Sequence, residues 1–228
     1  MATFGGFPPE TIRFLRELRA NNTKDWLDAH RANYEGHWVA PAKAFVVAAG
    51  ERLAELAPGI RAEPRVLGSI FRINRDTRFS RDQRPYKDHL DFWFWEGERR
   101  NAVSGFFARL SPEFLGVGAG CHSLDPERLA RFRRAVVHPA SGEELARIAK
   151  LVEGGGYELA GAALRRPPAG LPADGPAGRF LLHKALFVHY DEPVDDRVHT
   201  TAILATCARH WQAMGPLHRW LTDHVQVA

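Results

Sequence analysis

Cysteine, methionine and long hydrophobic runs are scarce in this sequence of 228 residues. Cys121 and Cys207 are the two cysteines. They form no CxxC pair, which excludes a disulfide framework and a cysteine-based zinc finger. The longest apolar stretch, residues 44–50, is far too short to span a bilayer, which takes roughly 20 residues. The first residues show no basic leader ahead of an apolar run. We therefore expect a reduced, cytoplasmic protein with no membrane segment.

Lysine is also rare. Only five of the 31 basic residues are lysine and 26 are arginine, in a chain of formal charge +4 and pI near 9.3. Together with the abundant alanine, glycine and proline, this skew is typical of a G+C-rich coding sequence. General basicity is therefore weak support for nucleic-acid binding, and the places where arginines cluster are more informative.

The sequence contains no recognisable metal or cofactor motif. None of the 11 histidines lies in an HExxH pattern, so we predict no metal site. The glycines of residues 116–120 (GVGAG) precede a predicted helix, but they lack both the P-loop lysine and the GxGxxG spacing. We predict a plain turn there and no bound cofactor.

Hydrophobic periodicity predicts an α+β protein. Apolar residues spaced three or four apart indicate helices near residues 9–18, 34–56, 125–136, 141–152 and 203–225, and a short helix that Asn22 or Thr23 caps is expected to carry Trp26, Leu27 and His30. Patterns rich in β-forming residues indicate strands near residues 66–73, 91–95, 102–110, 113–117 and 180–189. We expect a central, mainly antiparallel sheet flanked by N-terminal and C-terminal helices. Residues 1–228 then form a single domain, with a Pro/Gly-rich internal loop at about 165–178.

Three local patterns give sharper expectations. Residues 91–95 (DFWFW) are apolar on both faces, which favours a central strand that is covered on both sides. Pro41 interrupts the helical stripe of residues 34–56 and predicts a break or kink near residues 39–41. Gly215 and Pro216 predict a second break, within the C-terminal helical stripe.

Residues 72–87 (RINRDTRFSRDQRPYK) are the most distinctive segment. A basic residue occupies every third position, a period that fits neither a strand nor an α-helix. An extended polyproline-like path or a strand that runs into a turn fits better, and Pro85 supports the strand and turn. The guanidinium group is a rigid fork matched to carboxylate and phosphate oxygens, and six clustered cations repel one another unless anions lie among them. We expect Arg75 and Arg78 to clamp an anion, with Arg72 and Ser80 assisting.

Other residues fit around such an anion. Asp76 would orient an arginine or act as a base, while Tyr86 or Lys87 would supply a proton or electrostatic stabilisation. Asn22 and Trp26 become a second wall of the same pocket if their helix points at this segment. The structural alternative stays open, in which Asp76 and Asp82 simply neutralise the arginines and brace the fold.

The pattern RxxRDxRFSxDxxPYK over residues 72–87 resembles the signature of the bacterial and fungal family catalogued as domain of unknown function 2461. Further similarities cover nearly the whole chain: FGGF at residues 4–7, Asn21-Asn22 with Trp26 and Arg31, GAG at residues 118–120, and Pro216-Leu217. A lysine usually follows the aspartate that matches Asp82, but here Gln83 follows, with Arg84 next. The resemblance implies an α+β fold of about this length and no particular activity.

Three functions compete at this point. The first is binding, with or without turnover, of a small phosphate- or carboxylate-bearing molecule at residues 72–87. The second, less favoured, is nucleic-acid binding through the same segment with Phe79, Tyr86 and Trp93. The third is an interaction or scaffold module in which the arginines are internal bracing. The sequence does not specify the oligomeric state.

Overall fold

The computed structural model describes residues 4–78, 80–172 and 174–226. Its helices are α1 (Pro9–Ala20), α2 (Lys24–Ala29), α3 (Arg31–Asn33), the π-helix η1 (Tyr34–Val39), α4 (Ala40–Ala54), α5 (Pro126–Val137), α6 (Pro139–Gly154), the 3₁₀-helices η2 (Gly178–Leu182) and η3 (Asp196–His199), and α7 (Ala202–Val225). Its strands are β1 (Ile60–Arg61), β2 (Leu90–Glu96), β3 (Gly105–Leu110), β4 (Phe114–Cys121), β5 (Glu158–Ala162) and β6 (His183–Pro193).

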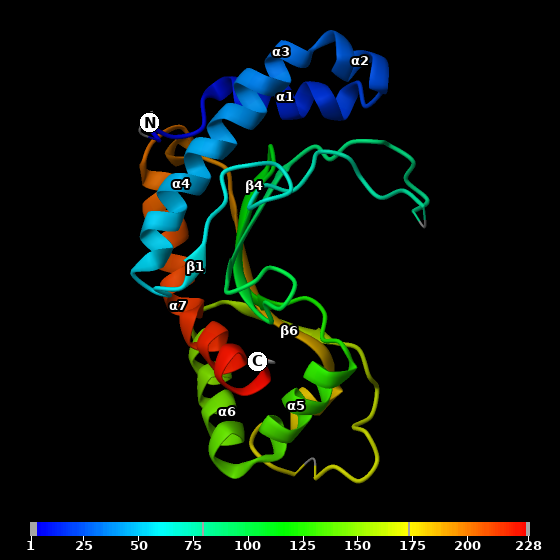
Figure 1. The fold of residues 1–228 in the computed structure, drawn as a ribbon, viewed down its shortest axis with the longest axis vertical. Coiled ribbons are helices and arrows are strands. Elements are labelled where there is room, and N and C mark those ends of the chain that lie inside the picture. The colour runs from blue at the N-terminus through cyan, green and yellow to red at the C-terminus, as the bar shows by residue number, and fades with distance from the viewer. Residues whose placement is uncertain (1–3, 79, 173, 227–228) are drawn as a thin grey trace. The chain divides into compact units, whose positions relative to one another are not determined.

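The strands form one antiparallel sheet in the order β1-β2-β3-β4-β6-β5, and helices precede and follow it along the chain (Figure 1). The predicted α+β architecture is confirmed. Strand β2 contains the DFWFW sequence, but it lies beside the short edge strand β1 and not at the centre. Within the described residues, no helix is long and apolar enough to cross a membrane.

The chain divides into two compact units, each built from separate segments. Unit 1 contains Met1–Phe94, Phe107–Gly116 and Asp191–Ala208, and unit 2 contains Trp95–Phe106, Val117–Tyr190 and Arg209–Ala228. The single-domain organisation stays a prediction. The Pro/Gly-rich stretch at about residues 165–178 belongs to unit 2. Its described residues before Gly178 contain no helix or strand, and Gly178 begins η2.

Aromatic side chains form the core of unit 1. Phe45 packs on Phe92 with ring centroids 4.7 Å apart, and Phe4 and Phe7 meet the same cluster at 5.3–5.5 Å. Gly6, between these two phenylalanines, has φ +116°, and a Cβ there would overlap backbone atoms of residues 199–200. The FGGF sequence thus buries two rings through a turn that only glycine allows.

The predicted interruption near Pro41 takes the form of the π-helix η1, which runs directly into α4. Proline has no N–H, so Pro41 cannot provide the α-helical hydrogen bond to the carbonyl of His37. The hydroxyl of Thr11, which is fully buried in α1, donates to that carbonyl at 2.6 Å. A side chain 26 positions away therefore satisfies the acceptor that proline leaves open.

Helices α5, α6 and α7 provide the core of unit 2. Asp125 caps α5 by accepting from the amide of Arg128 at 2.9 Å, and Pro126 occupies its first turn, so the helix begins close to the predicted position. The indole N–H of Trp220 donates to the carbonyl of Ser141 at 2.9 Å, which joins α7 to α6. Trp220 also meets Phe132 edge to face.

Two expected interruptions are wrong. Residues 116–120 belong to strand β4, because these glycines allow close approach and do not form a turn. A Cβ on Gly116 would lie 2.7 Å from the carboxylate of Asp191, and a Cβ on Gly120 would lie 2.5 Å from the carbonyl of Leu186. Helix α7 also continues through Pro216. Proline removes one helical hydrogen bond there, and the fully buried Met214 and Leu217 on either side hold the helix by packing.

The strand expected at residues 66–73 is also wrong. These residues make only isolated bridges, one of which pairs Ile70 with Phe92. Leu67 adopts a positive φ of 67° in the turn between Val66 and Ile70. This backbone conformation prevents a continuous extended path.

Candidate functional site in the arginine-rich arm

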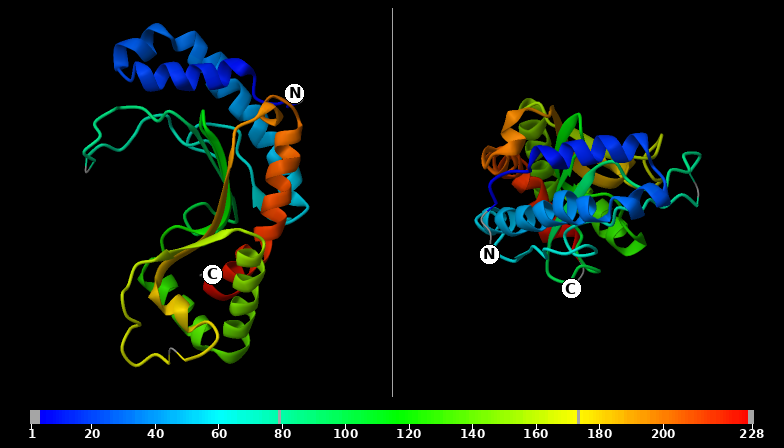
Figure 2. Two further views of the ribbon diagram at one scale, coloured as in Figure 1. Left: turned by 180° about the vertical axis from the view of Figure 1, so that it is seen from behind. Right: turned by 90° about the horizontal axis from the view of Figure 1, so that it is seen from above.

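Residues 72–87 form an arm that folds back on itself within unit 1. Its two sides pair through an antiparallel bridge between Asn74 and Tyr86. The amide of Arg75 donates to the carbonyl of Pro85, and the amide of Lys87 donates to the carbonyl of Ile73, both at 2.8 Å. The segment extends from the body of unit 1 near α1 and α2, as the front and rear views show (Figure 1; Figure 2). The segment is extended, as predicted, but its turn comes before Pro85. The amide of Ser80 donates to the carbonyl of Thr77 at 3.1 Å, and Pro85 lies on the returning side, opposite Arg75.

Two aspartates neutralise three of the arm's arginines. Arg78 binds Asp76 through two hydrogen bonds, at 2.9 and 2.7 Å. Arg84 binds Asp82 at 2.7 Å, and Arg75 reaches the same carboxylate from across the arm. Hydrogen bonds from Arg78 lower the pKa of Asp76 to about 2, and those from Arg84 and then Arg75 hold the pKa of Asp82 well below its usual range. Both aspartates are therefore charged at neutral pH.

The Asp76–Arg78 pair is local in origin. In both Asp76-x-Arg78 and Asp82-x-Arg84, the carboxylate accepts from the arginine amide two residues later as well as from its guanidinium. Asp195 and Arg197 repeat this arrangement elsewhere in unit 1, with an amide hydrogen bond of 2.9 Å. An Asp-x-Arg sequence thus forms this pair without any other feature of the arm.

Arg72 and Arg81 are exposed and have no ion pair among the described residues. Arg72 nevertheless lies close enough to Asp76 to lower the pKa of that carboxyl, after the larger effect of Arg78. Asp76 thus pairs with Arg78 and also feels the charge of Arg72, so positive charge is left over at this point of the arm.

The base of the arm contains a denser network, in which Asp91 is the central acceptor. Its carboxylate oxygens lie 2.7 Å from a side-chain nitrogen of Arg109, 3.1 Å from that of Lys87 and 3.2 Å from a ring nitrogen of His89. Burial alone would raise the pKa of Asp91, but its hydrogen bonds with His89 and Arg109 outweigh this effect and the pKa is lowered. Lys87 also lies 5.0 Å from the ring centroid of Phe71. Lys87 is thus held in place on two sides.

A second acid, Asp88, connects this network to α1. His89 lies 3.2 Å from Asp88, so its ring is placed between the two aspartates. Arg19 of α1 donates to Asp88 at 2.7 Å and to Glu113 at 2.8 Å. The hydrogen bonds to Glu113 and Asp88 raise the pKa of Arg19 above its usual value. The network therefore fixes the arm to both α1 and the sheet.

Asn22 also fixes the arm. Its amide group donates to the carbonyl of Tyr86 at 3.1 Å and accepts from the amide of Tyr86 at 3.0 Å, as a paired strand would. The side chain of Tyr86 is buried. Trp26 instead stacks on His30, with centroids 4.1 Å apart. Asn22 thus lies against the arm, whereas the contacts of Trp26 are made with its own helix and with Phe14.

Ser80 and Gln83 shape the tip of the arm. The hydroxyl of Ser80 accepts from the amide of Asp82 at 3.1 Å, and Gln83 donates to the carbonyls of Ser80 and Thr77. Gln83 occupies the position where the resemblance leads us to expect lysine, and its side-chain amide stabilises the backbone of the turn through these hydrogen bonds. Arg84 is engaged with Asp82.

The aromatic residues named for nucleic-acid binding do not form one described surface. Phe79 lies outside the described residues, and the Tyr86 ring is buried. Trp93 is partly buried in β2, where its amide donates to the carbonyl of Ser69 at 3.0 Å. Within the described part of the chain, no group of three or more histidine, cysteine, aspartate or glutamate residues could hold a metal ion.

The sequence indicated the arm but not the network at its base. Arg19, Arg109 and Glu113 come from α1, β3 and the β3–β4 turn, and nothing local in the sequence ties them to Asp88 or Asp91. The one usable signal was the placement of Asp88 and Asp91 directly after Lys87.

A comparison with protein families finds one match, to the family described as "Conserved hypothetical protein (DUF2461)", over residues 10–220. Neither the curated proteins nor the solved structures contain a significant match to the chain.

Proposed function

The chain belongs to the DUF2461 family of conserved hypothetical proteins, and from that premise we propose that the arm binds a small molecule bearing a phosphate or a carboxylate. Between residues 72 and 91 the sequence has six lysine or arginine side chains and four aspartates. An anion at the arm would balance this excess.

The observation that carries the proposal is the exposed Asp76–Arg78 pair, with the exposed Arg72 near enough for its charge to act on the Asp76 carboxyl. Arg78 is 76% exposed and its partner Asp76 is 48% exposed. An ion pair so open to water contributes little to stability. Arg78 can therefore exchange Asp76 for a ligand oxygen at little cost. Arg72, exposed beside the same carboxylate, provides the second guanidinium for a phosphate or carboxylate.

The remaining predicted residues support this site in a different way. Arg75 is 24% exposed and holds Asp82 across the arm, while Lys87 is held by Asp91 and Phe71. In this proposal both keep the arm in shape, and Arg72 and Arg78 contact the ligand.

We limit the proposal to binding. Asp76 was the predicted base, but its pKa is about 2. Such a carboxylate accepts a proton poorly at neutral pH, where an efficient general base has a pKa nearer to 7. Tyr86 is buried, and Lys87 is engaged with Asp91. An anion held by two arginines needs neither side chain to react.

The test is a titration of the protein with inorganic phosphate and pyrophosphate, followed by amide chemical shifts in NMR spectra. The Arg72→Ala/Arg78→Ala variant should bind at least about tenfold more weakly, because it loses two charge-assisted contacts. Arg197→Ala serves as a control, since it removes an Asp-x-Arg pair, together with a contact to Glu192, at another place in unit 1. Its affinity should equal that of the wild type.

Two results would contradict the proposal. One is the absence of saturable shifts in the amides of residues 72–87. The other is equal loss of affinity in the double variant and in Arg197→Ala, which would indicate a general electrostatic effect. The melting temperature of each variant, measured in the same buffer, separates loss of binding from loss of stability.

A further inference from the structure

His89 lies between two aspartates at the base of the arm. Its Nδ1 is 3.2 Å from Oδ1 of Asp88, and its Nε2 is 3.2 Å from Oδ2 of Asp91. The three side chains are 20%, 21% and 13% exposed, so water reaches the ring only in part. Both nitrogens of one imidazole ring are thus within hydrogen-bond distance of a carboxylate oxygen.

This arrangement fits the imidazolium form of His89. A neutral imidazole has one N–H and one nitrogen lone pair, whereas the imidazolium has two N–H groups. In the neutral ring, the lone pair would face a carboxylate oxygen at 3.2 Å, and two acceptors so close repel each other. The protonated ring, in contrast, donates to Asp88 and Asp91 at the same time.

The partners of the two aspartates complete a chain of alternating charge from α1 to β3. Arg19 of α1 donates to Oδ2 of Asp88 at 2.7 Å, and the other oxygen faces His89. Arg109 of β3 donates to Oδ1 of Asp91 at 2.7 Å, and again the other oxygen faces His89. The protonated ring is therefore the middle link of this chain, and each carboxylate lies between two cations.

Three other charged side chains contact members of this chain: Arg84, Lys87 and Glu113. The two cations share the aspartates with His89 and oppose its charge, but neither lysine nor arginine offers an acceptor to a ring nitrogen. Glu113 pairs with Arg19 at 2.8 Å and adds an acid on the α1 side. The two carboxylates next to the ring therefore decide which form of His89 fits.

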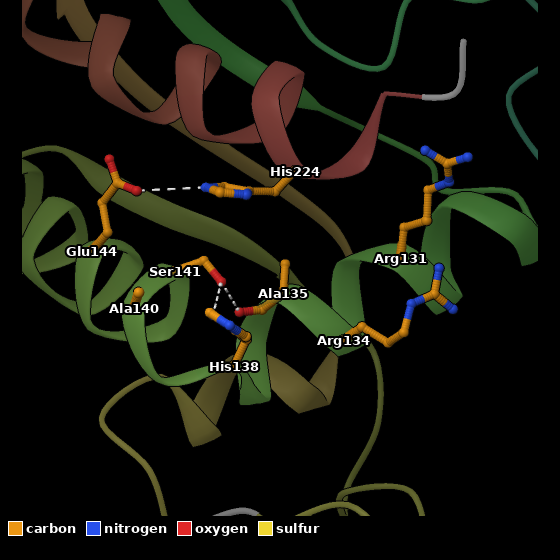
Figure 3. A pocket seen from close by; sticks show the side chains of 8 residues that line it. All are labelled: Arg131, Arg134, Ala135, His138, Ala140, Ser141, Glu144 and His224. Carbon is orange, nitrogen blue, oxygen red and sulfur yellow. Dashed lines mark hydrogen bonds and ion pairs between the residues drawn. The ribbon is translucent and has the colours of Figure 1, made fainter.

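A histidine in unit 2 shows the simpler case. His224 of α7 faces the carboxylate of Glu144 at 3.5 Å through one ring nitrogen (Figure 3). One N–H is enough for this contact, so the neutral ring can also make it. A single contact of this kind persists when the ring loses a proton, whereas the double contact of His89 does not.

We propose that His89 holds the base of the arm in place while its ring is protonated, and that the base loosens when the ring loses a proton. As an imidazolium, His89 joins Asp88 to Asp91 and so links α1, the arm and β3. An imidazole ordinarily titrates at about pH 6.5, and the neutral ring keeps one of the two links. The base of the arm is then looser above neutral pH than below it. This device does not depend on the binding of an anion by the arm.

The test is hydrogen exchange of the full chain at a series of pH values, followed by NMR. The rate of each amide is divided by the rate of an unstructured peptide at the same pH, which gives its protection. The amides of Tyr86 and Lys87 are hydrogen-bonded at the base of the arm. Their protection should fall at least about threefold between about pH 6 and 8, with the midpoint of the His89 ring titration. The amide of Ala57, hydrogen-bonded elsewhere in unit 1, should keep constant protection.

Two variants separate His89 from other titrating groups. His89→Gln cannot titrate, so the protection of the Tyr86 and Lys87 amides should stay at the lower, high-pH level of the wild type at every pH. His224→Gln removes the single histidine–carboxylate contact of unit 2 and should keep the wild-type pH dependence.

Three results would overturn the proposal. They are constant protection of the two amides in the wild type, a midpoint that differs from that of the His89 ring, and an unchanged pH dependence in His89→Gln. The first two are measured on the wild type alone, so the proposal is tested even where His89→Gln does not fold.

Discussion

Replacing Thr11 by valine should destabilise the protein because it removes the donor that compensates for Pro41. Thr11 is fully buried, and its hydroxyl lies 2.6 Å from the carbonyl of His37. Valine has nearly the same shape, so little packing is lost, but the carbonyl loses this partner. Such a loss costs about 1–3 kcal/mol. For a protein of this size, each kcal/mol lowers the melting temperature by about 2–4 °C.

A double-mutant cycle identifies the cause. Pro41→Ala restores an N–H at the α-helical position for His37, so Thr11→Val should cost clearly less in that background. Urea unfolding of the four variants, followed by tryptophan fluorescence, gives the coupling free energy. Thr222→Val controls for loss of an exposed hydroxyl that bonds within its own helix. This control should change stability by less than about 0.5 kcal/mol. Equal costs of Thr11→Val with and without Pro41 would refute the reasoning.

Three further predictions concern single sites in unit 1. The Cβ of Gly6→Ala meets neighbouring backbone, whereas that of Gly5→Ala has open space around it. Gly6→Ala should therefore destabilise by more than about 2 kcal/mol in thermal melts, while Gly5→Ala should change little. Asn22→Ala should cost about 1–3 kcal/mol and speed hydrogen exchange at the Tyr86 amide, which loses its acceptor; unchanged exchange would contradict the pairing. Because the pKa of Asp91 is lowered on folding, its stabilisation is present above the unfolded pKa of about 3.9 and is lost at lower pH. The stability gap between wild type and Asp91→Asn should therefore shrink as pH falls from about 5 to 2, as urea midpoints would show.

The parts of the fold that depend on near neighbours were predictable. The start of α5 follows from Asp125 as a cap and Pro126 in the first turn. The extended path of residues 72–87 follows from a period that suits no regular element, whereas Pro85 did not locate the turn, which comes earlier in the segment. In each case the residues that decide the structure lie within a few positions of one another.

The errors have a common physical cause, namely contacts made by distant segments. The glycines of β4 look like a turn in the sequence, yet Gly116 and Gly120 are small because Asp191 and Leu186 of β6 lie against them. Pro216 is a residue that usually marks a helix end, yet α7 continues past it because buried side chains pack on both sides. A local pattern shows which residue is small or rigid, but not which distant neighbour requires it.

For the same reason, a buried polar network in unit 2 could not be predicted from the sequence. His218 of α7 lies 2.9 Å from the hydroxyl of Ser104 and 3.0 Å from the carboxylate of Glu96. Side chains of these three types also form catalytic triads. Here, however, Ser104 is 2% exposed and His218 is 1% exposed, so no substrate reaches the hydroxyl. The network instead satisfies polar groups in the core, and no spacing in the sequence joins His218 to partners so distant along the chain.

The arginines of the arm differ in how far along the chain their partners lie. This difference distinguishes arginines that hold the arm together from those proposed to bind a ligand. Arg75 is partly buried and pairs with Asp82 seven positions away, so this pair joins the two sides of the arm. Arg78 pairs with Asp76 two positions away while both remain exposed, and Arg197 pairs with Asp195 in the same way while it also reaches Glu192 at 3.5 Å. A local, exposed pair forms whether or not the fold needs it, and it can exchange partners at little cost. The arginines with local or no partners are therefore the ones that can bind a ligand without unfolding the arm.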